Sequence, residues 1–138
     1  MNGTCALCSV TAELIDSHFL PAALYKEMND PAGPIKNMNA VTPKGTYQSG
    51  EQFHMPLLCQ DCEIRFQQGG ENRTLAMRYR SDGTYPLREL LRQSKSIYSN
   101  EGTSVYDAVA IADIKTDHLI YFAASIFWRA GVTSGLSL

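Results

Sequence analysis

The sequence predicts an α+β protein in which a small metal-binding domain over residues 1–70 is followed by a helical extension over residues 71–138. Three observations support this class. Two identical Cys-x-x-Cys pairs occur, short apolar segments suited to strands flank them, and helix-period apolar residues follow the second pair. The 138 residues are enough for one domain, or for one domain with an appendage.

The composition is that of an ordinary folded protein. Hydrophobic residues make up 44% of the chain and charged residues 19%, which argues against disorder. The net charge of −2 gives no overall attraction to nucleic acid, so any contact with phosphate needs a local basic patch.

We expect neither a targeting segment nor a membrane segment. "MNGTCALC" lacks a basic region followed by an apolar run, so we expect no signal peptide. The most apolar segment, "LIYFAASIFW", has about half the length that a membrane span requires. We therefore expect a cytoplasmic protein, and in a reducing compartment paired cysteines are metal ligands more often than disulfides.

The four cysteines form two pairs of the same spacing, Cys5 with Cys8 and Cys59 with Cys62. Two intervening residues make a tight turn that directs both sulfurs to one point, and two such turns supply a tetrahedral zinc site. The 50 residues between the pairs exceed the usual spacing of roughly 15–20, so a segment is inserted between them. Two buried thiol pairs, a redox pair and an iron–sulfur cluster are the alternatives.

The first elements lie around the first cysteine pair. Residues 4–9 are expected to form the turn, and residues 11–16 the strand that returns from it. Pro21 suits the first turn of a helix over residues 21–30, since its missing N–H is not needed there. Leu24 and Met28 then share one face of that helix.

The middle of the chain is rich in turn-forming residues, from the breakers at 29–34 up to residue 52. Lys44-Gly45, between two short segments, predicts the turn of a small hairpin. Residues 54–59, "HMPLLC", predict a short strand that leads into the second cysteine pair.

Helical patterns dominate the second half. A helix is expected over residues 60–80, broken or kinked by the Gly-Gly pair at 69–70. A second helix is expected over residues 85–99. The last helix is expected to begin at residue 106 or 116 and to run to residue 129.

Basic residues are concentrated in one part of the chain. Residues 65–95 contain seven bases against three acids, whereas residues 1–63 contain three bases against seven acids. The seven bases are Arg65, Arg73, Arg78, Arg80, Arg88, Arg92 and Lys95. Two interpretations remain open: a solvated helix face, or a surface that binds the phosphates of DNA through the forked guanidinium groups.

The order of these features resembles a known family. The chain resembles the HNH endonuclease-like treble-clef, or ββα-metal, proteins. The likeness lies in the order of a cysteine pair, a strand, Ser17-His18 with Pro21 after it, and "LLCQDCE" leading into a helix. The likeness is narrower to uncharacterised bacterial and phage proteins with "SH…P" and "LLC..CE" elements. It covers residues 5–70, and "IYFAASIFWRA" resembles a helix found further on in longer members.

The resemblance implies a catalytic centre beside a structural zinc held by the cysteines. It assigns the general base that activates water to His18, and the orienting position to His54. Glu63 stands where an ion ligand is usual and suits Mg²⁺ or Mn²⁺. Ser17 replaces the customary Asp or His, so Asp16 or Ser17 would assist. The implied activity is cleavage of DNA phosphodiester bonds by a hydrolase.

Each of these residues also has a structural interpretation. His18 can pack beside the cysteines, and His54 can lie on the surface. Glu63 can stabilise the first turn of a helix by its negative charge. His118, which has no companions, is expected on a helix surface.

Two further functions therefore stay open. The chain can be a non-catalytic zinc module that binds nucleic acid or a protein in a phage or defence system, or a purely structural module. The aromatic residues of the last helix, Phe122, Phe127 and Trp128, predict either a core or an interface with a protein partner or a second copy.

Overall fold

The computed structural model describes residues 1–29, 39–42, 45–48 and 52–133, and it confirms the α+β class. The chain forms two compact units. The first contains Met1–Ile64 and Ile126–Leu138, and the second contains Arg65–Ser125. The domain boundary expected near residue 70 stays a prediction.

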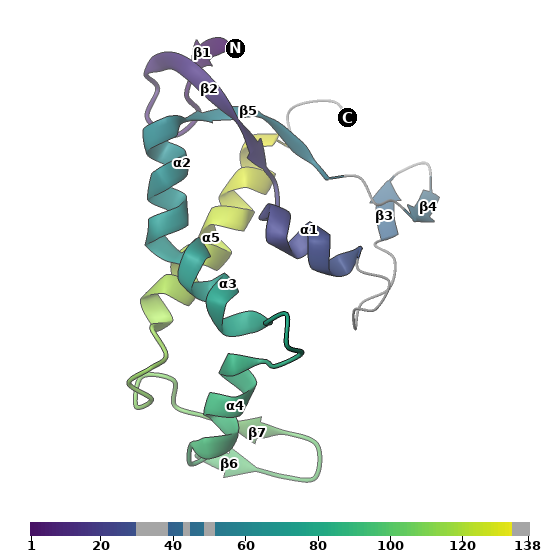
Figure 1. Cartoon of the computed structure of the whole chain (residues 1–138), viewed down its shortest axis with the longest axis vertical. Helices are drawn as coiled ribbons and strands as arrows, with labels where there is room; N and C mark the ends of the chain where they lie inside the picture. Colours follow the sequence, from purple (N-terminus) through teal and green to yellow (C-terminus); the bar gives the residue numbers. More distant parts are fainter. Residues whose placement is uncertain (30–38, 43–44, 49–51, 134–138) are drawn as a thin grey trace. The chain divides into compact units, whose positions relative to one another are not determined.

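A three-stranded antiparallel sheet forms the frame of the first unit (Figure 1). Its strands lie in the order β1 (Asn2–Thr4), β2 (Thr11–His18) and β5 (His54–Cys59). The strand predicted over residues 11–16 thus continues to His18, and β1 was not predicted. The longer β2 places His18 directly opposite His54.

Helix α1 (Ala22–Met28) is shorter than the predicted range of residues 21–30, and Pro21 is its N-cap residue and not part of its first turn. The helix contributes Tyr25, which is completely buried and whose hydroxyl accepts a hydrogen bond from the Phe53 N–H at 3.3 Å. Leu57 and Leu58 of β5 are also buried.

The predicted hairpin is present. Strands β3 (Asn39–Thr42) and β4 (Gly45–Gln48) pair antiparallel, with Thr42 opposite Gly45. Gly45 has a φ of +133°, a conformation that glycine adopts without steric penalty. The turn residues 43–44 and most of the breaker cluster at 29–34 lie outside the described residues.

The helix predicted over residues 60–80 is continuous, and the break expected at the glycine pair is a widened π segment instead. Helix α2 (Gln60–Phe66) passes through the π-helix η1 (Gln67–Glu71) into α3 (Asn72–Arg78). Gly69 and Gly70 lie against the final helix. A Cβ on Gly69 would meet the Tyr121 ring at 2.5 Å, and a Cβ on Gly70 would meet the His118 carbonyl oxygen at 2.3 Å.

The helix predicted over residues 85–99 is too long. Helix α4 (Pro86–Gln93) ends where Ser94 turns extended and its hydroxyl donates to the Leu90 carbonyl at 2.8 Å. The residues after it form β6 (Tyr98–Ser99), which pairs with β7 (Ser104–Val105). Pairing between β6 and β7 determines the conformation of this segment, so its helix-like sequence pattern led to a wrong prediction.

The last helix, α5 (Thr116–Thr133), starts at the later of the two expected positions and passes the predicted end at residue 129. Within the second unit, its Tyr121 packs edge-to-face on the buried Phe66, with ring centroids 6.0 Å apart. Ile114, in the turn before α5, is also buried.

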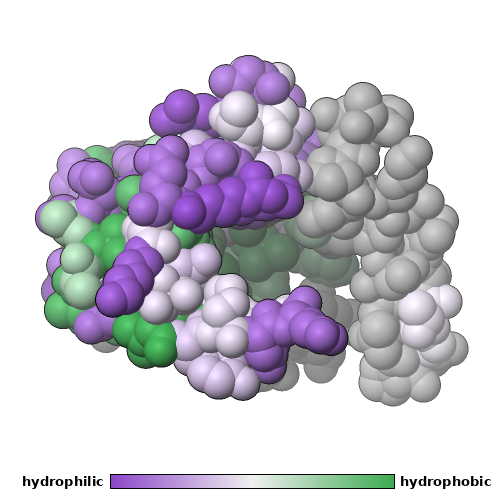
Figure 2. All heavy atoms as spheres, turned by 90° about the horizontal axis from the view of Figure 1, so that it is seen from below, coloured by the Kyte–Doolittle hydropathy of each residue, from purple (hydrophilic) through white to green (hydrophobic). Residues whose placement is uncertain are grey.

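Some large apolar side chains remain on the surface. In the view of Figure 2, hydrophobic side chains interrupt a largely polar surface. In the second unit, Ile97, Val109 and Ile120 are 69%, 82% and 69% exposed. None of the helices in the described part of the chain combines the length and the hydrophobicity that crossing a membrane requires.

Candidate metal centre and histidine site

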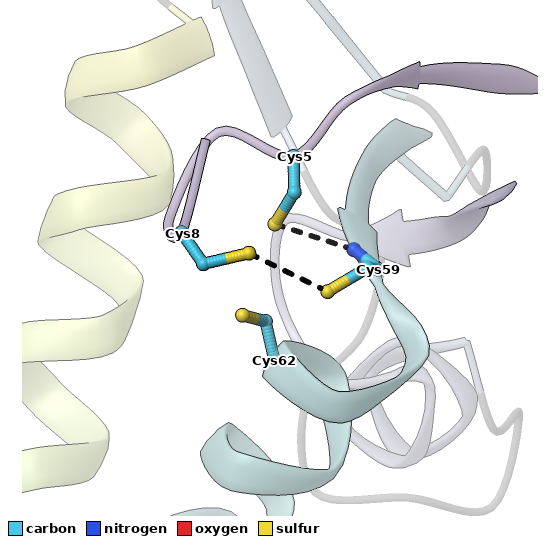
Figure 3. A group of neighbouring side chains, drawn as sticks. All are labelled: Cys5, Cys8, Cys59 and Cys62. Carbon is cyan, nitrogen blue, oxygen red and sulfur yellow. Dashed lines mark hydrogen bonds between the residues drawn. The ribbon is translucent and has the colours of Figure 1, made fainter. Parts of the chain in front are cut away.

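The four cysteine sulfurs converge on one point (Figure 3). All four Sγ atoms lie within 4.8 Å of one another, and none of the cysteines forms a disulfide. Cys5 and Cys8 belong to the turn after β1, Cys59 ends β5, and Cys62 lies in the first turn of α2. The two pairs are therefore brought together by the antiparallel pairing of β2 with β5.

Backbone hydrogen bonds hold the first cysteine turn. The Ser9 N–H donates to the Cys5 carbonyl and the Cys5 N–H to the Val10 carbonyl, both at 2.9 Å. Ser9 has a φ of 62°, the left-handed conformation that reverses the chain. The Ala6 N–H donates to the Leu57 carbonyl at 3.1 Å, which ties the turn to β5.

The spacing of the sulfurs fits a tetrahedral zinc ion. A Zn–S bond of about 2.3 Å implies a separation of about 3.8 Å between sulfurs at the corners of a regular tetrahedron. Sγ of Cys8 and Sγ of Cys59 are 3.8 Å apart. The donor set of four thiolates is also the usual one for structural zinc.

The close approach of the four thiol groups to one another favours the binding of a cation between them. Burial acts to raise the pKa of Cys5, but backbone N–H donors, above all that of Cys59, outweigh it and lower the pKa to about 6. Burial and the neighbouring thiols raise the pKa of Cys62. Several thiolates can share so small a space only when a positive ion neutralises them.

A second group of polar side chains lies at the other end of β2 and β5. The Asp16 carboxylate is 2.6 Å from Nδ1 of His54, and the rings of His54 and His18 are 5.3 Å apart between centroids. Nε2 of His18 donates to the Gln52 side-chain oxygen at 2.8 Å. His18 also lies near the ring of Tyr25, at 6.3 Å between centroids.

Glu63 belongs to a different set of contacts. The Ser17 hydroxyl donates to Glu63 Oε2 at 2.9 Å, and Arg129 Nη2 lies 3.5 Å from Glu63 Oε1. Ser17 and Arg129 are almost completely buried, at 2% and 1% exposure. Because successive side chains of a strand alternate between its faces, Ser17 and His18 point to opposite sides of β2.

The structure thus brings together only some of the predicted site residues. Asp16, His18 and His54 form one group, and Ser17 and Glu63 form the other. Arg129 was missed, although it is the single arginine in the apolar helix α5, which contains no lysine, and such a residue is a signal for a buried partner. His118, expected on a surface, is half-buried in α5 and its Nδ1 is enclosed.

The residues near Glu63 do not fit a site for a hard divalent cation. Among the described residues, the four cysteines are the only group of three or more potential ligands that converge. Both carboxylate oxygens of Glu63 already have partners in Ser17 and Arg129. A Mg²⁺ or Mn²⁺ ion would have to displace a buried guanidinium group.

A pocket of about 360 Å³ opens beside the histidine group. Its lining includes His18, His54, Ser17 and Arg129, together with apolar residues of β5 such as Met55. The pocket is large enough for a phosphate group and part of a nucleotide, and two imidazole groups belong to its lining, whereas the Arg129 guanidinium is almost completely buried against Glu63.

The fold and the site define an α+β protein with a candidate four-cysteine metal centre. No protein-family model matches the chain, and no match was found among curated proteins or solved structures. The family resemblance and the treble clef stay predictions.

Proposed function

We propose that this protein is a phosphodiesterase of the HNH-like type that has a structural zinc ion and cleaves DNA in the cytoplasm. The observation that carries the proposal is the Asp16–His54 pair beside His18, on strands whose other end is held by the four cysteines. A carboxylate, two imidazole groups and an adjoining pocket are a suitable set for general acid–base catalysis on a phosphodiester.

The zinc ion is structural in this proposal. When bound, it neutralises the four thiolates and stabilises the folded state. The cysteine turns are connected to β2 and β5 by backbone hydrogen bonds, so a filled site fixes the two strands that carry the histidines.

The contacts of the two histidines differ, and this difference assigns their roles. His54 donates from Nδ1 to the Asp16 carboxylate, which leaves its Nε2 as the proton acceptor. A carboxylate also stabilises the imidazolium ion that forms when a water proton is taken up. His18 donates to the neutral amide of Gln52, which gives no such stabilisation.

We therefore assign the general base to His54, although the resemblance assigns it to His18. Nε2 of His54 takes a proton from the water that attacks phosphorus. His18, when it carries a second proton on Nδ1, protonates the oxygen that leaves. No step is assigned to Mg²⁺ or Mn²⁺, because Glu63 is already engaged.

Plasmid nicking tests the proposal. Zinc-loaded protein is incubated with supercoiled plasmid, without divalent ions and with Mg²⁺ or Mn²⁺, and wild type is compared with His54→Ala and His18→Ala. Loss of the base lowers the rate by roughly 10²- to 10⁴-fold. Glu13→Gln, an exposed change on β2, is the matched control. Undiminished nicking by both histidine variants contradicts the proposal.

A second function is favoured by the contacts of Glu63. Ser17 and Arg129 contact both carboxylate oxygens of Glu63, so an ion pair stands where Glu63 would otherwise bind Mg²⁺ or Mn²⁺. This favours a non-catalytic zinc module that binds nucleic acid or a protein. The same experiment separates the two functions: the module gives no nicking with any ion, but a gel shift that weakens with salt.

A further inference from the structure

The second unit has a pocket of its own, with a volume of about 510 Å³. Residues of α3, α4, α5 and the segment after β7 line it. Three of them are arginines, Arg78, Arg88 and Arg92, and none of the lining residues is acidic. The pocket therefore lies among basic side chains of the stretch that the sequence shows, while its own accessible surface is almost wholly apolar.

The walls between the arginines are apolar and aromatic. Tyr85 and Tyr106 contribute rings, and leucines of α4 and α5 contribute the remaining surface. The Tyr85 ring contacts the ring of Tyr79, with centroids 5.2 Å apart and the planes tilted by 52°. A ring that is held in this way loses little further freedom when a flat ligand stacks on it.

One polar group in the lining has no partner. Oγ1 of Thr74 is buried and forms no hydrogen bond with any described residue. A buried hydroxyl in this condition destabilises the protein unless a ligand or water satisfies it. This atom has almost no accessible surface, so the hydroxyl is closed to a ligand, and the pocket offers a ligand mainly apolar surface.

Arg92 remains able to bind an anion at the edge of the pocket. Arg92 lies 3.2 Å from Glu89 on the same helix, in a pair whose side chains are about half exposed. Such surface ion pairs contribute little to the free energy of folding, so a phosphate can replace Glu89 as the partner of Arg92 or share the contact.

We propose that this pocket receives one unpaired base of a single-stranded nucleic acid. The base stacks on the tyrosines inside the apolar pocket, and the flanking phosphates bind Arg88 and Arg92, which are exposed at its edge. A base-paired duplex keeps its bases stacked inside the helix and cannot fill an apolar pocket. The inference shares nucleic acid as partner with the proposed function, but it does not require cleavage.

Binding is measured by fluorescence anisotropy on the full-length, zinc-loaded protein without Mg²⁺ or Mn²⁺. The probes are a labelled thymidine oligonucleotide of about 12 nucleotides, an abasic strand of the same length, and a duplex. Stacking predicts at least about fivefold tighter binding of the thymidine strand than of the abasic strand. Anionic lipid vesicles serve as a further competitor.

Three variants locate the site. Tyr106→Leu removes the preference for bases, whereas Tyr98→Leu, at a tyrosine that is 56% exposed and not part of the lining, preserves it. Arg88→Ala weakens both single strands and lowers the salt slope by about one.

Several results would overturn the inference. These are equal binding of abasic and thymidine strands, tighter binding of duplex or vesicles, or equal effects of Tyr106→Leu and Tyr98→Leu. The inference and the proposed function fail separately. Base-dependent binding without nicking contradicts only the nuclease, and nicking without any base preference contradicts only the pocket.

Discussion

The Asp16 carboxylate lies 2.6 Å from Nδ1 of His54, although these residues are not opposite each other in the sheet. Asp16 pairs with Pro56, while His54 pairs with His18. The register shifts between Ile15 and Asp16, so that one residue of β5, Leu57, has no partner in β2. Its carbonyl instead accepts the Ala6 N–H of the first cysteine turn. One bulge therefore connects the metal centre with the alignment of the histidine group.

Asp16→Asn tests the role of this contact. We expect zinc content and melting temperature to be unchanged, because both side chains are about half exposed. Nicking should fall by about 10²-fold or more, because an amide no longer selects the Nδ1–H tautomer or stabilises the imidazolium ion.

The ¹⁵N resonances of the His54 ring report the tautomer directly and do not depend on activity. Glu13→Gln is again the control. An unchanged tautomer and an unchanged rate in Asp16→Asn would show that the carboxylate has no positioning role.

Cys8→Ser separates metal binding from packing. Cys8 is exposed, so the substitution removes no core contact, and any large loss of stability must come from the metal. We expect the zinc content to fall and the free energy of unfolding to decrease by about 3 kcal/mol. Elemental analysis and thermal unfolding check this, with and without a chelator.

Ser104→Ala, in the exposed β7, is the control for the cysteine variant. A chelator should lower the melting temperature of wild type and of this control alike, and should leave Cys8→Ser almost unchanged. Equal zinc content in wild type and Cys8→Ser would contradict the four-cysteine site.

The buried Arg129–Glu63 pair should contribute strongly to stability. Replacing Arg129 by Ala leaves the Glu63 carboxylate, only 13% exposed, without its cation. Removal of one member of a buried pair costs about 3–5 kcal/mol. Urea unfolding of both single variants and of the double variant measures the coupling, and the double variant should lose less than the sum.

The surface pair formed by Arg92 and Glu89 offers a matched comparison, since its side chains are about half exposed. Arg92→Ala should change the free energy of unfolding by less than about 1 kcal/mol. Similar decreases in the free energy of unfolding for Arg92→Ala and Arg129→Ala would mean that burial does not strengthen the contact between Arg129 and Glu63.

Gly70→Ala tests the close approach of the π segment to α5. The new Cβ would lie 2.3 Å from the His118 carbonyl oxygen and 2.9 Å from the Phe122 nitrogen. Both are backbone atoms that cannot rotate away, so we expect a loss of about 1–3 kcal/mol or more. Gly102→Ala, which meets nothing within 4 Å, should be nearly neutral. Equal melting temperatures for the two variants would contradict the packing described.

The sequence was most informative where a local rule applies. The spacing within each cysteine pair, the proline before α1 and the glycine of the β3–β4 hairpin all act through a few neighbouring residues. It failed where partners are distant in the chain. Residues 94–99 have a helix-like pattern, yet Tyr98 and Ser99 pair with β7. Likewise, nothing local distinguishes Arg129 as the partner of Glu63, 66 residues away.

The sequence alone indicated the donor set of the candidate metal centre, because the spacing of two residues within each pair can direct both sulfurs to one point. Only the tertiary structure decided how the remaining candidates are grouped. Ser17 and His18 are neighbours in sequence, but the alternation of a strand separates their side chains, so one meets Glu63 and the other lies beside His54. Side-chain direction depends on strand pairing and on a bulge, and both arise from contacts between segments that are distant in the chain.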